Sequence, residues 1–155
     1  MRSYLIFASW SLLAGVGIPL IGVLNSGVAR SVGNPYAATA LMFAIAATIA
    51  LGIALPFYGL PTIAQLAGAP LISYGAGLLI GFYALSATVI IPRIGAATFI
   101  AFILIAQLLT SAVVDHFGLL GVAKRPIDLS KSIGIAVILI GIAIMQFGNS
   151  FKSQP

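Results

Sequence analysis

Three polar residues of one strongly apolar segment, residues 94–116, fall on a single helical face. Gln107, Ser111 and Asp115 follow one another at intervals of four residues, and side chains at i, i+4 and i+8 lie above one another on a helix. Gln107 lies near the middle of the segment, where its amide could exchange hydrogen bonds with a solute, and Ser111 would extend the path. The same amide could instead bond a neighbouring helix, a contact worth about 0.6 kcal/mol in membranes. Both interpretations of Gln107 remain open.

A second candidate amide lies in the first apolar segment, residues 4–29. Gly15, Gly22 and Asn25 share one stripe of this segment, and Pro19 removes a backbone donor, so it should kink the helix. Secondary transporters coordinate ligands beside broken helices of this kind. We therefore expect Asn25 to bind a solute and Pro19 to act as a hinge. The alternative is that the glycines and Pro19 permit tight packing while Asn25 caps the helix.

The chain has few residues that could carry out acid–base chemistry. Asp115 is the one carboxylate that could face a cavity, and proton coupling generally needs an ionisable group along the path. Because Asp115 lies at a helix end, pairing with His116, or with a base such as Arg93 or Lys124, is the more ordinary role. Adjacent residues point to different helix faces and no positioned nucleophile is evident, so we expect no enzyme. With one histidine and no cysteine, we also expect no metal and no cofactor.

Three other side chains are weaker candidates for the solute path. Arg30 could attract an anionic solute or gate the path, although an arginine at the end of a span more readily anchors it at the headgroups. Trp10 and Tyr83 lie well inside their segments and could line a pocket for an organic ligand. Single aromatic residues in membrane proteins are more often packing or interface residues.

Glycine recurs at a fixed interval in the last apolar segment. Gly134, Gly141 and Gly148 are seven residues apart, so they form a smooth stripe. Such a stripe predicts close helix packing and carries no chemistry. Asp128 or Ser130 is a suitable N-cap for this last helix.

The whole chain has too little charge to cover a water-exposed surface. Hydrophobic residues make up 61% of it and charged residues 6%, with a mean hydropathy of +1.21, against roughly 45–50% and 25% in soluble domains. Apolar segments of about 20 residues, divided by proline, glycine and isolated charges, predict membrane-spanning helices. We therefore expect an all-α, polytopic integral membrane protein with a single membrane domain over residues 1–155. The expected spans are residues 4–29, 36–55, 71–91, 94–116 and 130–148.

The basic residues bear on topology rather than on a nucleic-acid partner, because they are scattered along the chain. With five spans, one side of the membrane carries Arg2, Lys124, Arg125 and Lys131, and the other carries Arg30, Arg93 and Lys152. This near balance predicts that the chain can insert in both orientations, unless one cluster dominates. Two antiparallel copies would recreate the inverted repeats of a ten-span transporter.

Several short segments together carry a family resemblance. They are Gly15-Val-Gly-Ile-Pro-Leu20 with Asn25 and Ala29-Arg30, Val32-Gly33-Asn-Pro35, Tyr74-Gly-Ala-Gly77 with Gly81-Phe-Tyr83, and Gln107 through Asp115-His116-Phe117-Gly118. In this order they resemble the five-span, half-size branch of the drug/metabolite transporter superfamily, the YdcZ-like small membrane proteins. Ala106 stands where such proteins often have glycine. The resemblance implies an inner-membrane transporter half that dimerises, and it implies no particular substrate.

Together these observations predict a secondary transporter that moves a small organic solute by alternating access as an antiparallel dimer. Asn25 and Gln107 of both copies would form a shared site at the membrane midplane. No acidic residue occurs in the first three spans, so a neutral, zwitterionic or anionic solute is favoured over a lipophilic cation. The alternatives are a small dual-topology channel, a non-transporting subunit of another membrane complex, and a dimer with an oppositely oriented homologous chain.

Overall fold

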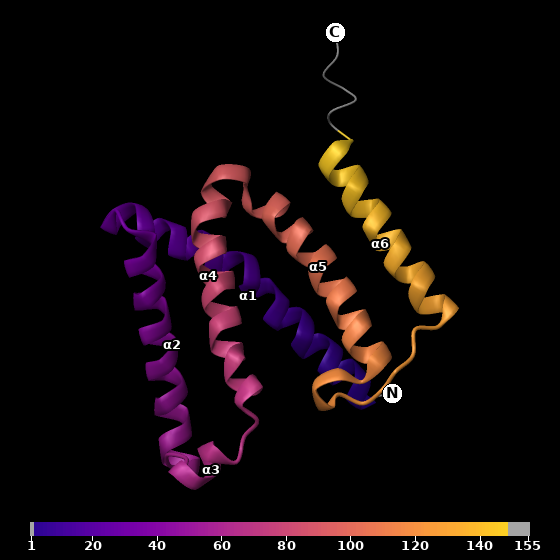
Figure 1. The fold of residues 1–155 in the computed structure, drawn as a ribbon. Coiled ribbons are helices and arrows are strands. Elements are labelled where there is room, and N and C mark those ends of the chain that lie inside the picture. The colour runs from indigo at the N-terminus through magenta and orange to yellow at the C-terminus, as the bar shows by residue number, and fades with distance from the viewer. Residues whose placement is uncertain (1, 149–155) are drawn as a thin grey trace. The chain divides into compact units, whose positions relative to one another are not determined.

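The computed structural model describes residues 2–148, and all regular elements in this range are helical. In chain order they are α1 (Arg2–Val32), α2 (Pro35–Tyr58), α3 (Ile63–Ala67), the 3-10 turn η1 (Leu71–Tyr74), α4 (Gly75–Ile94), α5 (Ala96–Phe117), the 3-10 turn η2 (Leu119–Gly121) and α6 (Leu129–Phe147) (Figure 1). Lys152 and the rest of the C-terminal tail lie outside the described residues.

Five of these helical segments are long and apolar enough to cross a membrane. They are Tyr4–Val32, Pro35–Tyr58, Leu71–Ile94, Ala96–Phe117 and Leu129–Phe147. Each boundary lies within three residues of the one expected from the sequence. The predicted fold class, an all-α polytopic membrane protein, is therefore confirmed.

The turn between α1 and α2 follows directly from its residue types. Gly33 has a φ of 72°, a left-handed conformation that glycine adopts without steric cost. The Asn34 side chain then accepts hydrogen bonds from Tyr36 N at 2.9 Å and Ala37 N at 3.2 Å, and Pro35 occupies the first helical position. An asparagine N-cap followed by proline begins a helix at a defined residue.

The described residues form two compact units, which divide after Ala96. In the first unit α1 contacts both α2 and α4, and α2 also contacts α4; Figure 1 shows α2 and α4 side by side with α1 crossing them. Small residues make these approaches possible, since Ala38, Ala84 and Ala87 are all buried. The first unit is thus an assembly of three long helices, α1, α2 and α4. The prediction of one membrane domain over the whole chain remains a prediction.

Gly22 lies in close contact with α4 where α1 crosses it. A Cβ atom at this position would overlap the Ile91 side chain and lie 3.2 Å from Ala87 Cβ. Gly15, on the same predicted stripe, has nothing within 4 Å of the place its Cβ would take. Only the C-terminal part of the stripe therefore packs in the described structure.

In the second unit, the connection between α5 and α6 folds back onto the end of α5. Gly118 takes the left-handed conformation, with φ 66°, and Arg125 N then donates to the Asp115 carbonyl oxygen at 2.8 Å. Asp128 caps α6 by accepting from Lys131 N at 2.7 Å. Of the two N-caps suggested by the sequence, Asp128 is the one used.

Candidate solute-binding site

Four polar residues are buried where α1, α2 and α4 meet. They are Asn25, Ser26, Thr39 and Thr88, which we call the Asn25 cluster, and each is between 2% and 6% exposed. Such burial is notable because polar groups inside membrane proteins are costly and tend to be functional. The sequence indicated Asn25 alone. The three hydroxyl residues were missed because a serine or threonine in a helix is readily satisfied by its own backbone.

The Asn25 amide nitrogen joins the other two helices of the unit. Nδ2 donates to Thr88 Oγ1 at 2.7 Å and to Thr39 Oγ1 at 3.2 Å. The Thr88 hydroxyl donates in turn to the Ala84 carbonyl oxygen at 2.8 Å. The two threonine oxygens are 3.4 Å apart, and because Thr88 has already used its one hydrogen, Thr39 is the donor of that pair.

Ser26 ties α1 to the backbone of α4. Its Oγ lies 2.6 Å from the Gly22 carbonyl oxygen and 3.1 Å from the Thr88 carbonyl oxygen. These contacts satisfy the hydroxyl within the protein, so Ser26 has a structural role in the cluster. Asn25 and Ser26 of α1 therefore both form hydrogen bonds to Thr88 of α4.

These contacts exclude one interpretation of Asn25. The sequence left open that Asn25 caps the first span, but α1 continues to Val32. The Asn25 side chain bonds α2 and α4 rather than the end of its own helix. The capping part of that alternative was wrong, because α1 continues past Asn25 to Val32, whereas the tight packing that it also predicted is formed at Gly22.

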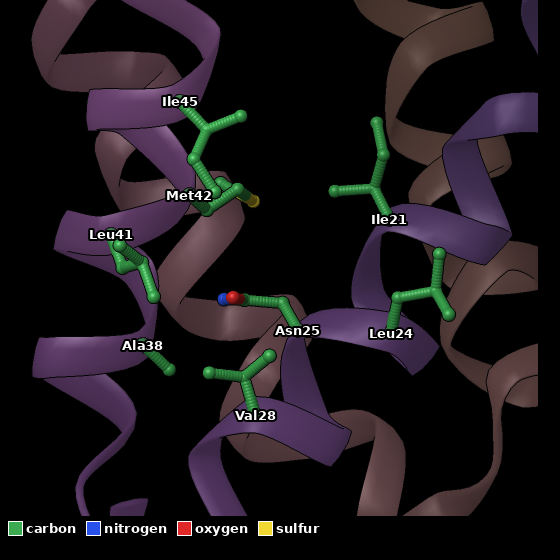
Figure 2. Close-up of a pocket in the computed structure, with 8 residues that line it drawn as sticks. All are labelled: Ile21, Leu24, Asn25, Val28, Ala38, Leu41, Met42 and Ile45. Carbon is green, nitrogen blue, oxygen red and sulfur yellow. The ribbon is translucent and has the colours of Figure 1, made fainter.

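A pocket of about 250 Å³ lies between α1 and α2, with Asn25 in its wall. From α1 the lining residues are Ile21, Leu24, Asn25 and Val28. From α2 they are Ala38, Leu41, Met42 and Ile45. Figure 2 shows the Asn25 side chain extending from α1 toward α2 among these apolar side chains. Both amide hydrogens are used by the threonines, and Oδ1 has no hydrogen-bond partner among the described residues.

The second unit carries the polar face predicted from the four-residue spacing. Gln107, Ser111 and Asp115 line one shallow groove along α5. Ser111 Oγ donates to the Leu108 carbonyl oxygen of its own helix at 3.0 Å, and Gln107 is exposed. Gln107 and Asn25 lie in different compact units, so their expected shared midplane site remains a prediction.

Asp115 is engaged at the end of α5. Its Oδ2 lies 3.0 Å from Lys131 Nζ in an ion pair whose side chains are about one third exposed. The sequence suggested His116, Arg93 or Lys124 as the partner. Lys131 takes this place because the folded-back connection brings the first turn of α6 to the end of α5.

The His116 ring instead accepts from Ile127 N through Nδ1 at 3.1 Å, which places the hydrogen of the neutral ring on Nε2.

The remaining candidates lie apart from the Asn25 pocket. Trp10 is 74% exposed on α1, and at 1.5 Å per residue it lies about 22 Å from Asn25 along the helix. Tyr83 is half-buried on α4 and Arg30 is exposed in the last turn of α1. Neither of them lines the pocket. Pro19 lies inside α1, which continues through it, so its role as a hinge remains a prediction.

The glycines of α6 have no close neighbour along most of their stripe. Nothing lies within 4 Å of the place that a Cβ would take at Gly134 or Gly141, and Gly148 follows the last residue of the helix. The packing predicted for this stripe is therefore not formed within the described structure.

The five apolar helices of the described residues make this chain a multi-pass membrane protein. Residues 6–144 match the family described as "Putative inner membrane exporter, YdcZ". Because the match covers most of the chain, the chain belongs to this family, as its sequence motifs had indicated. The family is one of inner-membrane transporters, not of enzymes. No curated protein and no solved structure matches the chain.

Proposed function

We propose that the chain is one half of a secondary transporter that exports a small organic solute by alternating access. The observation that carries this proposal is the Asn25 amide, which is buried and fixed by two helices and leaves one acceptor atom beside a pocket. A fixed polar group in an otherwise apolar pocket orients a solute without a large reorganisation cost. Membership of an exporter family supports the same conclusion.

We further propose that two copies work as an antiparallel dimer. With five spans, four basic residues lie on one side of the membrane and three on the other. This near balance permits the chain to insert in both orientations. Gln107 supports an assembly as well, since an exposed amide in the middle of an apolar span is costly in lipid. In the assembled transporter the α5 groove would be covered, and Gln107 and Ser111 would contact the solute along its path.

The test is counterflow in proteoliposomes that contain the purified chain. The labelled solutes would be benzamide, alanine, benzoate and tetraphenylphosphonium, which are neutral, zwitterionic, anionic and cationic respectively. We expect saturable counterflow of at least one of the first three. Asn25→Leu should lower that flux about tenfold or more, because the fixed amide is lost. Gln65→Leu, which removes an amide on α3 outside the pocket, is the matched control and should leave the flux unchanged.

Two results would contradict the transporter proposal, and a third would contradict only the expected charge of its solute. An unsaturated current of high unitary rate would indicate a channel. Stable co-purification of a different polytopic chain, with no transport by this chain alone, would indicate a subunit of another complex. Accumulation of tetraphenylphosphonium against a proton gradient would show that the solute is a cation.

A further inference from the structure

The wall of the Asn25 pocket is almost entirely apolar. Asn25 is the one polar residue among those that line it, and none of them is charged. The volume of about 250 Å³ equals roughly eight waters at ~30 Å³ each and is below the ~300–1,000 Å³ of drug-sized sites. The pocket therefore suits a small molecule whose body is mostly apolar.

The hydrogen bonds of Asn25 decide which polar group that molecule can carry. Thr88 and Thr39 take the two Nδ2 hydrogens at 2.7 and 3.2 Å, so the amide has no donor left for an occupant. Oδ1 remains as an acceptor on a residue that is 6% exposed. An acceptor of this kind is satisfied by an O–H or N–H group, and a second acceptor facing it would be repelled.

The absence of charge in the pocket wall bears on the charge of the occupant. The pocket is open, with Leu24 69% and Ile45 55% exposed, but beside apolar side chains in a membrane span an ion without a partner is still far more costly than a neutral group with one hydrogen bond. A carboxylate would bring only acceptors to Oδ1. A zwitterion would present its ammonium to Oδ1 but leave its carboxylate unpaired. Of the three solute classes that the sequence favours, the pocket therefore suits the neutral class.

We infer that the Asn25 pocket binds a small, neutral, largely apolar molecule that donates one hydrogen bond to Asn25 Oδ1, such as an alcohol, a phenol or an amide. This inference rests on the proposed function, because it assigns a chemical class of solute to the Asn25 contact. It gives Thr39 and Thr88 a positioning role, since they fix the amide with its oxygen left for the solute.

Benzyl alcohol and anisole form a matched pair of probes, because they are isomers and only the alcohol has a donor. Benzoate has the same ring with a carboxylate. The methionine methyl groups provide the reporter: Met42 lines the pocket, and Met145 lies on α6 outside it. Binding would be followed by methyl NMR of the intact chain in nanodiscs, with probe concentrations referred to the amount dissolved in the lipid.

We expect benzyl alcohol to shift the Met42 signal saturably and the Met145 signal little. Its affinity should exceed that of anisole at least about fivefold, as the loss of one buried hydrogen bond implies, and benzoate should not shift Met42. Asn25→Leu should remove the preference for the alcohol, whereas Gln65→Leu should retain it. Thr39→Val frees one Nδ2 hydrogen for an occupant, so it should reduce the preference for the alcohol, and it serves as a second variant if Asn25→Leu does not fold.

Equal binding of anisole, tighter binding of benzoate, or no saturable shift of Met42 would each overturn the inference. The comparison in the native chain requires neither a variant nor transport. If the alcohol binds as expected and no solute shows counterflow, the transporter proposal fails while the chemistry of the pocket stands. If benzoate shows counterflow and benzyl alcohol leaves Met42 unchanged, the chemistry of the pocket fails while the transporter proposal stands.

Discussion

At the scale of single residues, Thr88 is the nearer of the two hydrogen-bond acceptors of the Asn25 amide. Thr88 provides the shorter of the two contacts to the amide and also bonds its own helix, whereas Thr39 lies 3.2 Å from Nδ2. Removing an acceptor leaves a buried N–H without a partner, which costs more than the hydrogen bond itself contributed. Thr88 should therefore be the more sensitive of the two threonines.

We expect Thr88→Val to lower the free energy of unfolding in mixed micelles by about 1–2 kcal/mol, because the amide loses its nearer acceptor. Thr39→Val should cost less, since its bond is longer. Thr48→Val is the control, as Thr48 is exposed on α2 and bonds only the Ala44 carbonyl oxygen of its own helix. A loss at Thr88 no larger than at Thr48 would show that the Asn25 amide is satisfied in another way.

Asp115 is the residue on which proton coupling would depend, and its ion pair with Lys131 favours a structural role. Because both side chains are about one third exposed, the pair should contribute only about 0.2–1 kcal/mol. We expect Asp115→Asn to reduce the free energy of unfolding by less than 1 kcal/mol and to leave counterflow within about twofold. Loss of proton-driven uptake with counterflow intact would instead assign Asp115 to coupling.

At the scale of elements, the crossing of α1 and α4 depends on one glycine of the first span. Gly22 has no space for a methyl group because the Ile91 side chain occupies it, whereas Gly15 has open space around it. The two glycines lie on the same helix and would look equivalent by composition. Their different surroundings provide a matched pair of substitutions.

We expect Gly22→Ala to destabilise the first unit by about 1–3 kcal/mol, the usual effect of overfilling a packed contact. Gly15→Ala should be neutral or slightly stabilising, since alanine favours helix. Ile91→Val removes the Cδ1 atom that the new methyl group would meet, so the double variant should be less destabilised than the sum of its parts. The free energies of unfolding would be measured by thermal unfolding in detergent. If the effects of Gly22→Ala and Ile91→Val simply add, the new methyl group does not meet Ile91.

At the scale of the whole molecule, the proposed transporter requires both orientations in one membrane. Reporter fusions to the C-terminus that are active in the cytoplasm or in the periplasm measure this directly. We expect both reporters to be active on the native sequence and the balance to shift when two lysines are added at the C-terminus. A single orientation would rule out the antiparallel homodimer and point to an oppositely oriented homologous chain as the partner.

The sequence alone determined which segments span the membrane, because the length and composition of an apolar helix are local properties. The same is true of the Asn34–Pro35 cap and of the shared face of Gln107 and Asp115, which follow from residue type and helical period. Asn25 was indicated as a polar residue in an apolar span. The family, too, could be inferred from the order of short motifs along the chain.

Only the tertiary structure decided what these residues contact. Asn25 meets Thr39 and Thr88, which are 14 and 63 residues away, and no local pattern specifies which faces of three similar apolar helices will meet. The same reason explains why Gly22 packs and Gly15 does not. The Asn25 amide offers a solute an acceptor and no donor, on which the proposed solute chemistry depends, because two distant threonines take both of its hydrogens.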